Sequence, residues 1–237
     1  KTLKELISSM EQFLAGMLSV TSKDDSKSYK ENYIVLEIAN ANGSDQFIFY
    51  VGVPRQYCEL FEKQIISILG TVRLSEVVDD YNIFNEDGVS VGSYLTLKES
   101  PVYPFKTYEV FDVDPLNVIL NSFSKIQKQG EGAAIQLVFA PQGDYFHKKY
   151  GYVIEQLEKG VPTKEAIHVP EGILGSFKKT LSGLFFASAP EDEKEKKIDT
   201  EAIEKIKRKI STPIVATNVR MIVSAKSRPD AERILGT

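Results

Sequence analysis

The sequence predicts an α+β fold made of two split-βαβ, ferredoxin-like units, with antiparallel sheets packed against helices. Three observations lead to this prediction. In several segments apolar residues recur every three or four positions, which is typical of amphipathic helices. In others apolar and polar residues alternate, which is typical of half-buried strands. These patterns follow one another as helix–strand–strand–helix–strand over residues 1–80, and a second series fills residues 89–237.

The first unit opens with an amphipathic helix and continues with two strands. The apolar stripe of the helix consists of Leu3, Leu6, Ile7, Met10, Phe13, Leu14 and Met17. This stripe is expected to pack on its own sheet, and docking of a partner is the alternative. Residues 33–39 and 46–53 alternate as strands do, and the intervening Asn42-Gly43-Ser44-Asp45 tolerates the positive φ of a hairpin turn.

A second helix and a third strand complete this unit. Pro54 suits the first turn of the helix, and Gly70 suits its end. Cys58 lies in an apolar stretch of this helix, so we predict a small core residue rather than a reactive thiol. Residues 71–78 are expected to form the third strand. The acidic segment 79–88 does not have the spacing of an EF-hand calcium loop and is predicted to be a solvated connection.

The second unit carries three strand patterns and several helix patterns. Strands are expected over 89–98, 134–140 and 214–225, and helices are expected to begin at Asp114-Pro115, Asp144, Asp199 and Ser227. Glycines and prolines punctuate residues 160–200, and residues 191–197 form a run of charges. We therefore predict a partly disordered insertion around 160–200.

Composition and motifs argue against a catalytic centre. The net charge of −4 gives no global attraction for nucleic acid, and a single cysteine excludes a disulfide framework or a multi-cysteine zinc site. No P-loop is present, and Gly130-Glu131-Gly132 lacks the third glycine of a dinucleotide fingerprint. His147 and His168 lack catalytic partners in the sequence and are expected to be structural or solvated. We therefore expect no enzyme activity, cofactor or metal, and an enzyme built on two convergent carboxylates is the alternative.

Two further features concern partners and membranes. Lys226, Arg228 and Arg233 form a basic cluster that is a candidate contact for DNA or for another protein domain. The chain has no run of about 18 apolar residues, which a membrane-spanning helix requires. The chain itself is therefore not expected to insert into a membrane.

A series of short motifs in the second unit carries a family resemblance. In order they are Tyr103-Pro104-Phe105-Lys106-Thr107-Tyr108, Asp112-Val113-Asp114-Pro115-Leu116, Ile135-Gln136-Leu137-Val138, Ala140-Pro141, Lys209-Ile210-Ser211-Thr212-Pro213 and Asn218-Val219-Arg220-Met221-Ile222-Val223-Ser224-Ala225. This order resembles the region ahead of the motor in bacterial HerA/FtsK-like ATPases related to the coupling proteins of conjugative type IV secretion. The resemblance covers roughly residues 90–235 and extends more loosely to the first unit.

The resemblance implies a non-catalytic N-terminal region that serves assembly, positioning or partner contact beside a DNA-translocating hexamer. ATP hydrolysis would belong to a downstream P-loop domain, and the chain, which opens at Lys1 without a methionine, looks like part of a longer polypeptide. The implied partners are that motor domain and other subunits, with DNA bound through the full-length protein. The implied location is cytoplasmic, with membrane association through a segment outside this chain.

Two questions stay open from the sequence. Tyr103, Pro104, Phe105 and Tyr108 are predicted to form a rigid aromatic packing strut, and a protein-contact surface is the alternative. For the whole chain, the alternative to a motor-associated region is a stand-alone scaffold or protein-binding module of a membrane-associated complex.

Overall fold

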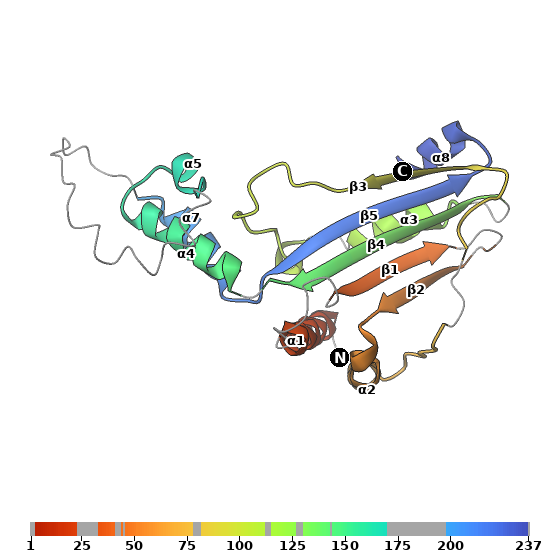
Figure 1. Ribbon diagram of the computed structural model, residues 1–237, viewed down its shortest axis with the longest axis horizontal. Helices are drawn as coiled ribbons and strands as arrows, with labels where there is room; N and C mark the ends of the chain where they lie inside the picture. The colour runs from red at the N-terminus through yellow and green to blue at the C-terminus, as the bar shows by residue number, and fades with distance from the viewer. Residues whose placement is uncertain are drawn as a thin grey trace. The chain divides into compact units, whose positions relative to one another are not determined.

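The chain folds into two compact units. The computed structural model describes residues 3–22, 33–40, 44, 46–77, 82–111, 115–126, 130–142, 144–169 and 198–236 (Figure 1). Unit 1 comprises Lys1–Thr96, Tyr108–Pro141 and Val215–Thr237, and unit 2 comprises Leu97–Thr107 and Gln142–Ile214. The predicted boundary, between 1–80 and 89–237, does not coincide with the boundary between these two units. Strands from both of the predicted ranges pair in one sheet.

Unit 1 is built on a five-stranded antiparallel sheet with the strand order β2-β1-β4-β5-β3 (Figure 1). The strands are β1 (Ile34–Asn40), β2 (Phe47–Gly52), β3 (Val89–Tyr94), β4 (Gly132–Pro141) and β5 (Val215–Ala225). The α+β class and the antiparallel sheet are thus confirmed. Two separate ferredoxin-like sheets are not found among the described residues, since β1 pairs with β4.

Helices cover one face of this sheet. They are α1 (Leu3–Ser22), α2 (Cys58–Leu69), α3 (Pro115–Phe123) and α8 (Arg228–Leu235), and 3-10 turns lie at Arg55–Tyr57 and Tyr108–Val110. The helices α1 and α2 pack on Ile34 and Phe139, whereas α3 and α8 pack on Ala133 and Val223. These four strand residues lie on the same face, because side chains alternate along a strand and opposed residues point the same way.

The N-terminal stripe packs on the sheet of its own unit, as the sequence predicts. Met17 is 1% exposed, and Phe13 packs edge-on against Phe61 of α2 with ring centroids 5.0 Å apart. Cys58, in contrast, is exposed, so the prediction of a core residue is wrong. The buried side of α2 passes instead through Phe61 and Ile65, three and seven residues further along the helix.

Residues 71–77 form no strand, contrary to the prediction. Val72 and Leu74 are half-buried while their neighbours are exposed, and this reproduces the alternation of a strand. Leu74 packs against the core under α1 and α2, but no described strand pairs with this segment. Alternating burial along a segment is therefore not sufficient for it to pair with a neighbouring strand.

Unit 2 is helical in its described part. It contains α4 (Tyr145–Glu158), α5 (Thr163–Ala166) and α7 (Thr200–Ile210), whose core includes the fully buried Leu157 and Ile206. Asp199, the predicted start of the last of these helices, accepts hydrogen bonds from the Ala202 amide at 3.0 Å and from the Thr163 hydroxyl at 2.6 Å. Asp199 thus starts α7 and connects it to α5.

Several predicted features lie outside the described residues. They are most of the hairpin turn at 42–45, the cap Asp114 and the greater part of the expected insertion, including the charge run at 191–197. Among the described residues, no helix is both long enough and apolar enough to span a membrane.

Candidate functional site

A polar row crosses the sheet face of unit 1 that points away from the helices. The strand register aligns Tyr94, Arg220, Gln136 and Glu37 on the adjacent strands β3, β5, β4 and β1. Directly opposed residues of antiparallel strands share a face, so these four side chains project to the same side. Tyr94 and Arg220 are exposed, and Gln136 and Glu37 are half-buried.

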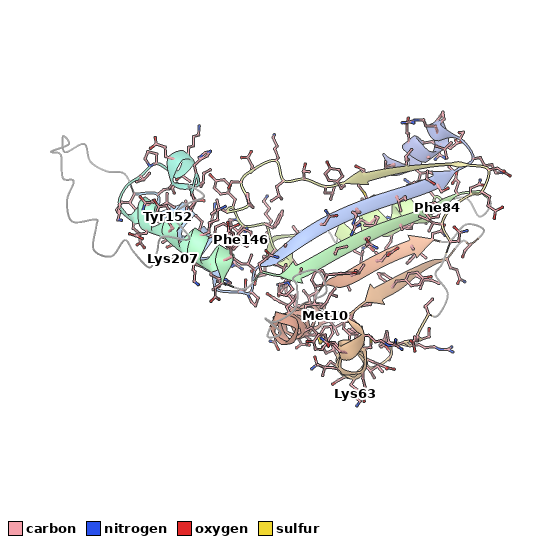
Figure 2. All side chains as sticks on the ribbon, in the orientation of Figure 1. Met10, Lys63, Phe84, Phe146, Tyr152 and Lys207 are labelled. Atoms are coloured by element: carbon pink, nitrogen blue, oxygen red, sulfur yellow. The ribbon has the colours of Figure 1, made fainter. Side chains whose placement is uncertain are left out.

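A groove of about 470 Å³ runs beside this row. Gly92 and Ala134 lie two residues before Tyr94 and Gln136 on their strands, on the same face as the row, and form part of the groove floor. Ile83 and Phe84, from the loop that precedes β3, line the groove opposite the polar row, and Phe84 is labelled in Figure 2. Glycine and alanine leave space on either side of Ile222, which lies between them in the strand register and also lines the groove.

Two glycines allow this loop to lie directly on the ends of β4 and β5. A Cβ on Gly132 would clash with the backbone of Ile83, coming within 2.9 Å of its carbonyl carbon, and a Cβ on Gly88 would clash with the carbonyl oxygen of Ala225. Ile83 is buried and packs on Ala134. The absence of side chains at Gly88 and Gly132 therefore sets the position of the groove wall.

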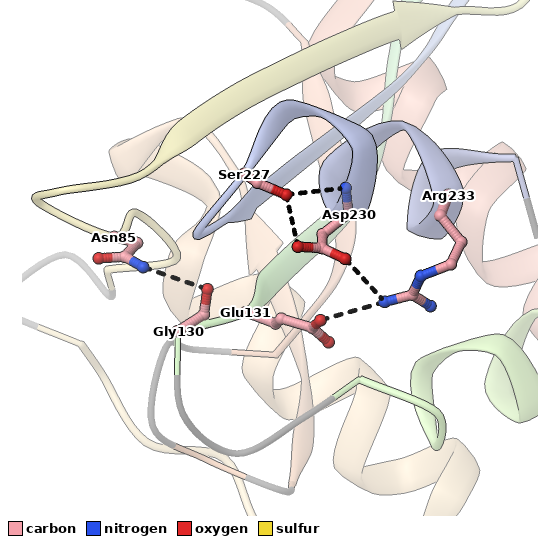
Figure 3. A network of polar contacts seen from close by, with 6 residues as sticks. All are labelled: Asn85, Gly130, Glu131, Ser227, Asp230 and Arg233. Atoms are coloured by element: carbon pink, nitrogen blue, oxygen red, sulfur yellow. Dashed lines mark hydrogen bonds and ion pairs between the residues drawn. The ribbon is translucent and has the colours of Figure 1, made fainter.

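Asn85 fixes the same loop through two hydrogen bonds. Its backbone amide donates to Ser224 Oγ at 2.9 Å, and its side-chain Nδ2 donates to the Gly130 carbonyl oxygen at 3.3 Å (Figure 3). Ser224 is fully buried, so its hydroxyl provides a fixed acceptor. These bonds attach the loop to β5 and to the turn that precedes β4.

The electrostatics of the groove are simple. Glu37 Oε2 accepts a hydrogen bond from Gln136 Nε2 at 2.9 Å. Arg220 is the only basic residue in the lining, and it has no ion-pair partner among the described residues. Glu37 is the only acid there, so the groove lacks the two convergent carboxylates that the enzymatic alternative requires. In the described part of the chain, no three metal-ligating side chains come together.

The structure places Arg233, from the predicted basic cluster, beside acids of its own unit. Its Nη2 lies 3.2 Å from Glu131 Oε1, whose side chain is largely buried, and 3.9 Å from Asp230 Oδ1 (Figure 3). Asp230 also accepts a hydrogen bond from Ser227, the predicted cap of α8, at 2.5 Å. Arg233 therefore has a structural role in anchoring α8 to the start of β4.

The other two members of the basic cluster differ from Arg233. Arg228 Nε donates to Glu232 Oε1 at 2.8 Å, in an exposed pair one helical turn apart. The carbon chain of Lys226 lies against Gly130, where a Cβ would contact it. The contact of Lys226, Arg228 and Arg233 with DNA or another domain stays a prediction. Arg228 and Arg233 already form ion pairs within the chain.

The predicted strut is divided between the two units. Tyr103 belongs to unit 2, where it packs against the helical core, and Tyr108 belongs to unit 1. Lys209 of α7 donates to the carbonyl oxygens of Pro101 and Tyr103, the latter at 3.1 Å. Phe105 is 74% exposed. Pro104 is half-buried, as Tyr103 is. The first two residues of the strut therefore pack, whereas Phe105 does not.

Tyr150 of α4 supports the same segment, and its titration provides a test. Its hydroxyl donates to the Pro101 carbonyl oxygen at 3.1 Å, and Lys209 Nζ lies 5.4 Å from its ring centroid. Burial raises the pKa of the Tyr150 phenol above its ordinary value near 10.

We predict that deprotonation of Tyr150 destabilises unit 2 above pH 10 and that Tyr150→Phe removes this contribution. Above about pH 10 the unfolded chain releases the phenolic proton while the folded chain retains it, so rising pH favours unfolding. At neutral pH, Tyr150→Phe should cost about 1 kcal/mol through the lost hydrogen bond. Urea unfolding at several pH values measures both effects, and an equal pH dependence in the two proteins would contradict the prediction.

Neither histidine lies in the groove. His147 Nε2 lies 3.2 Å from the Thr212 carbonyl oxygen, and its buried Nδ1 has no hydrogen-bond partner in the described structure. His168 Nδ1 lies 2.7 Å from the carbonyl oxygen of Lys164. Both contacts are with backbone oxygens of unit 2, which gives each ring a local structural partner.

The sequence does not indicate that the residues of the groove lie together. Glu37, Gln136 and Arg220 occupy the polar positions of alternating strands, which ordinarily indicate only a solvated face. The sequence feature that could have indicated this site is the charge of Arg220, because no other residue of β5 is charged. Their alignment depends on strand pairings between distant segments, which no local pattern reports.

Comparison with known protein families identifies the family of this chain. No curated protein and no solved structure matches this chain. A family described as a domain of unknown function, DUF8128, matches residues 2–236, which is nearly the whole chain. The chain therefore belongs to the DUF8128 family.

Proposed function

We propose that this chain is a non-catalytic docking module that binds a protein partner through the groove of unit 1. The observation that carries the proposal is the groove itself, on the sheet face opposite the helices. An antiparallel sheet commonly leaves one face to solvent, but such a face is ordinarily polar. Here Tyr94 is 67% exposed and Phe84 is 48% exposed at the groove. Exposed aromatic side chains beside a groove are typical anchors of protein interfaces.

The groove suits a protein better than nucleic acid. A surface that follows a phosphate backbone needs several cations, and the lining contains Arg220 alone together with the acid Glu37. The balanced charges and the aromatic rim favour a surface that recognises shape and a few polar groups.

We further propose that this docking serves assembly or positioning beside a DNA-translocating motor. The support is the order of motifs over roughly residues 90–235, which resembles the pre-motor region of HerA/FtsK-like ATPases of the type IV secretion kind. The partner would then be the motor domain or another subunit of the same assembly. The complete gene tests this part, because a gene without a Walker motif downstream of the chain would contradict it.

Filling the groove is expected to abolish docking. Gly92→Leu places a side chain on the groove floor at an exposed position, where a Cβ would lie 3.4 Å from the Met221 carbonyl oxygen. Binding of this variant to the separately expressed remainder of its full-length protein should weaken at least tenfold, or about 1.4 kcal/mol, by isothermal titration calorimetry.

The matched control is Gly52→Leu. Gly52 lies on β2, on the same sheet face, and a Cβ there would also have its nearest neighbour at 3.4 Å, in Val35, but the residue does not line the groove. We expect the control to bind like the unaltered chain. Equal affinities for the two leucine variants would show that the groove is not the docking site.

A second candidate function is that of a stand-alone scaffold that self-associates. The edge strand β2 favours it, because Ile48, Phe49 and Val51 are all more than two-fifths exposed and the strand carries no charge. Exposed apolar edge strands readily pair with another strand. Light scattering on the isolated chain separates the candidates, since a monomer at every concentration would count against the scaffold.

A further inference from the structure

We infer that the groove of unit 1 takes an extended, acidic segment of its protein partner, with a carboxylate bound by Arg220. This inference rests on the proposed docking function and adds the chemistry of the partner. Its basis is the combination of one guanidinium without an ion-pair partner among the described residues, the apolar Ile83 and Phe84 across the groove from it, and the small residues Gly92 and Ala134 in the lining.

Arg220 is placed to receive an anion. It stands between Tyr94 and Gln136 in the register, and none of the described residues forms an ion pair with it. The nearest acid in the row, Glu37, lies two strands away, at roughly 10 Å, and already accepts a hydrogen bond from Gln136. The planar fork of arginine matches the two oxygens of a carboxylate, so a partner carboxylate completes the pairing that this chain leaves open.

The dimensions of the groove fit an extended peptide. From β1 to β3 the row crosses three strand spacings, or roughly 14 Å, which four residues of extended chain would span at about 3.3 Å each. Successive side chains of such a peptide point to opposite sides. One side would face Arg220 and Gln136, and the other would face Ile83 and Phe84. The partner segment should therefore alternate acidic and apolar residues.

The openness of the groove favours a peptide over a small molecule, and the charge of the chain shows which contact must attract it. A small-molecule site ordinarily encloses most of its ligand, whereas this groove opens to solvent beside Tyr94 and Phe84, which are both exposed. The net charge of −4 opposes acidic ligands at long range, so attraction must come from the direct contact with Arg220. Binding should accordingly depend strongly on this one side chain.

The test uses peptide selection on the full chain. A phage library of random eight-residue peptides is selected on the immobilised protein, and the enriched peptides are synthesised with a fluorescein label. We expect alternating acidic and apolar residues among them. In fluorescence polarisation Arg220→Gln should weaken binding at least tenfold, and Arg220→Lys should weaken it less, because lysine keeps the charge and loses the fork. Arg220→Glu should prefer peptides in which lysine replaces the acid.

Two controls separate the possible outcomes. Arg228→Gln removes an exposed arginine of the same unit outside the groove and should leave the affinity unchanged. Peptides that lose binding with Gly92→Leu but not with Arg220→Gln would overturn the acidic partner and leave the docking function standing. Peptides that bind Gly92→Leu as well as the unaltered chain, or a selection that yields none, would overturn both. Unchanged thermal unfolding of the exposed Arg220 variants shows that folding is not the cause.

Discussion

Replacing Gly132 with alanine is expected to lower the free energy of unfolding of unit 1 by about 3 kcal/mol, at the upper end of ordinary overpacking effects. The added Cβ would clash with the carbonyl group of Ile83, and a backbone group cannot rotate away as a flexible side chain can. The loop that carries Ile83 and Phe84 would have to lift from β4. Urea unfolding measures the loss, and hydrogen exchange of residues 82–88 shows whether the loop is released.

The control for Gly132→Ala is Gly92→Ala in the same sheet. At Gly92 the added Cβ would lie 3.4 Å from its nearest neighbour, so we expect a change within about 0.5 kcal/mol. Because the loop forms the groove wall, Gly132→Ala should also weaken peptide binding, whereas Gly92→Ala should weaken it only slightly. An alanine at Gly132 that leaves both stability and loop exchange unchanged would contradict the described packing.

The helices of this fold were predictable because their signals are local. Asp199 and Ser227 are the predicted first residues of their helices, and each accepts a hydrogen bond from the amide three residues later. Gly70 ends α2 with φ of 64°, a conformation that favours glycine. Such features depend on a few neighbouring residues, so the sequence alone specifies them.

The pairing of the strands could not be predicted in the same way. Alternation located β1, β4 and β5 to within about two residues, but it does not reveal which strands are neighbours. The pair of β4 and β5 joins residues that are about 80 positions apart in the chain. A sheet assembled from distant segments therefore appeared as two sheets, and the groove across it was not visible.

Exposure of single residues also depends on the assembled fold. Cys58 lies among apolar residues in the sequence, yet it stands on the exposed side of α2. The helix buries one stripe, and the direction of that stripe is set by what packs against it. Phe13 of α1 contacts Phe61, which fixes the inward side of the helix and leaves Cys58 outside.

Truncation of Ile206 to alanine is expected to lower the free energy of unfolding of unit 2 by about 3 kcal/mol, within the usual 2–5 kcal/mol range for such changes. Ile206 is 0% exposed and packs in one core with Val153 and Leu157 of α4 and with Val102, the residue before the strut. The lost methyl groups would leave a cavity among three separate chain segments. Hydrogen exchange of α4 and α7 should accelerate in proportion to the lost stability.

Ile198→Ala provides the matched comparison for Ile206→Ala, because it makes the same chemical change just before α7, at a side chain that is 47% exposed. We expect it to cost less than about 1 kcal/mol, since little apolar surface returns to water there. If the two variants lost equal stability, α7 would not be the centre of this core. We expect hydrogen exchange of residues 101–103 to accelerate in Ile206→Ala and not in Ile198→Ala. This result would show that the contact of Val102 with this core holds the strut in place.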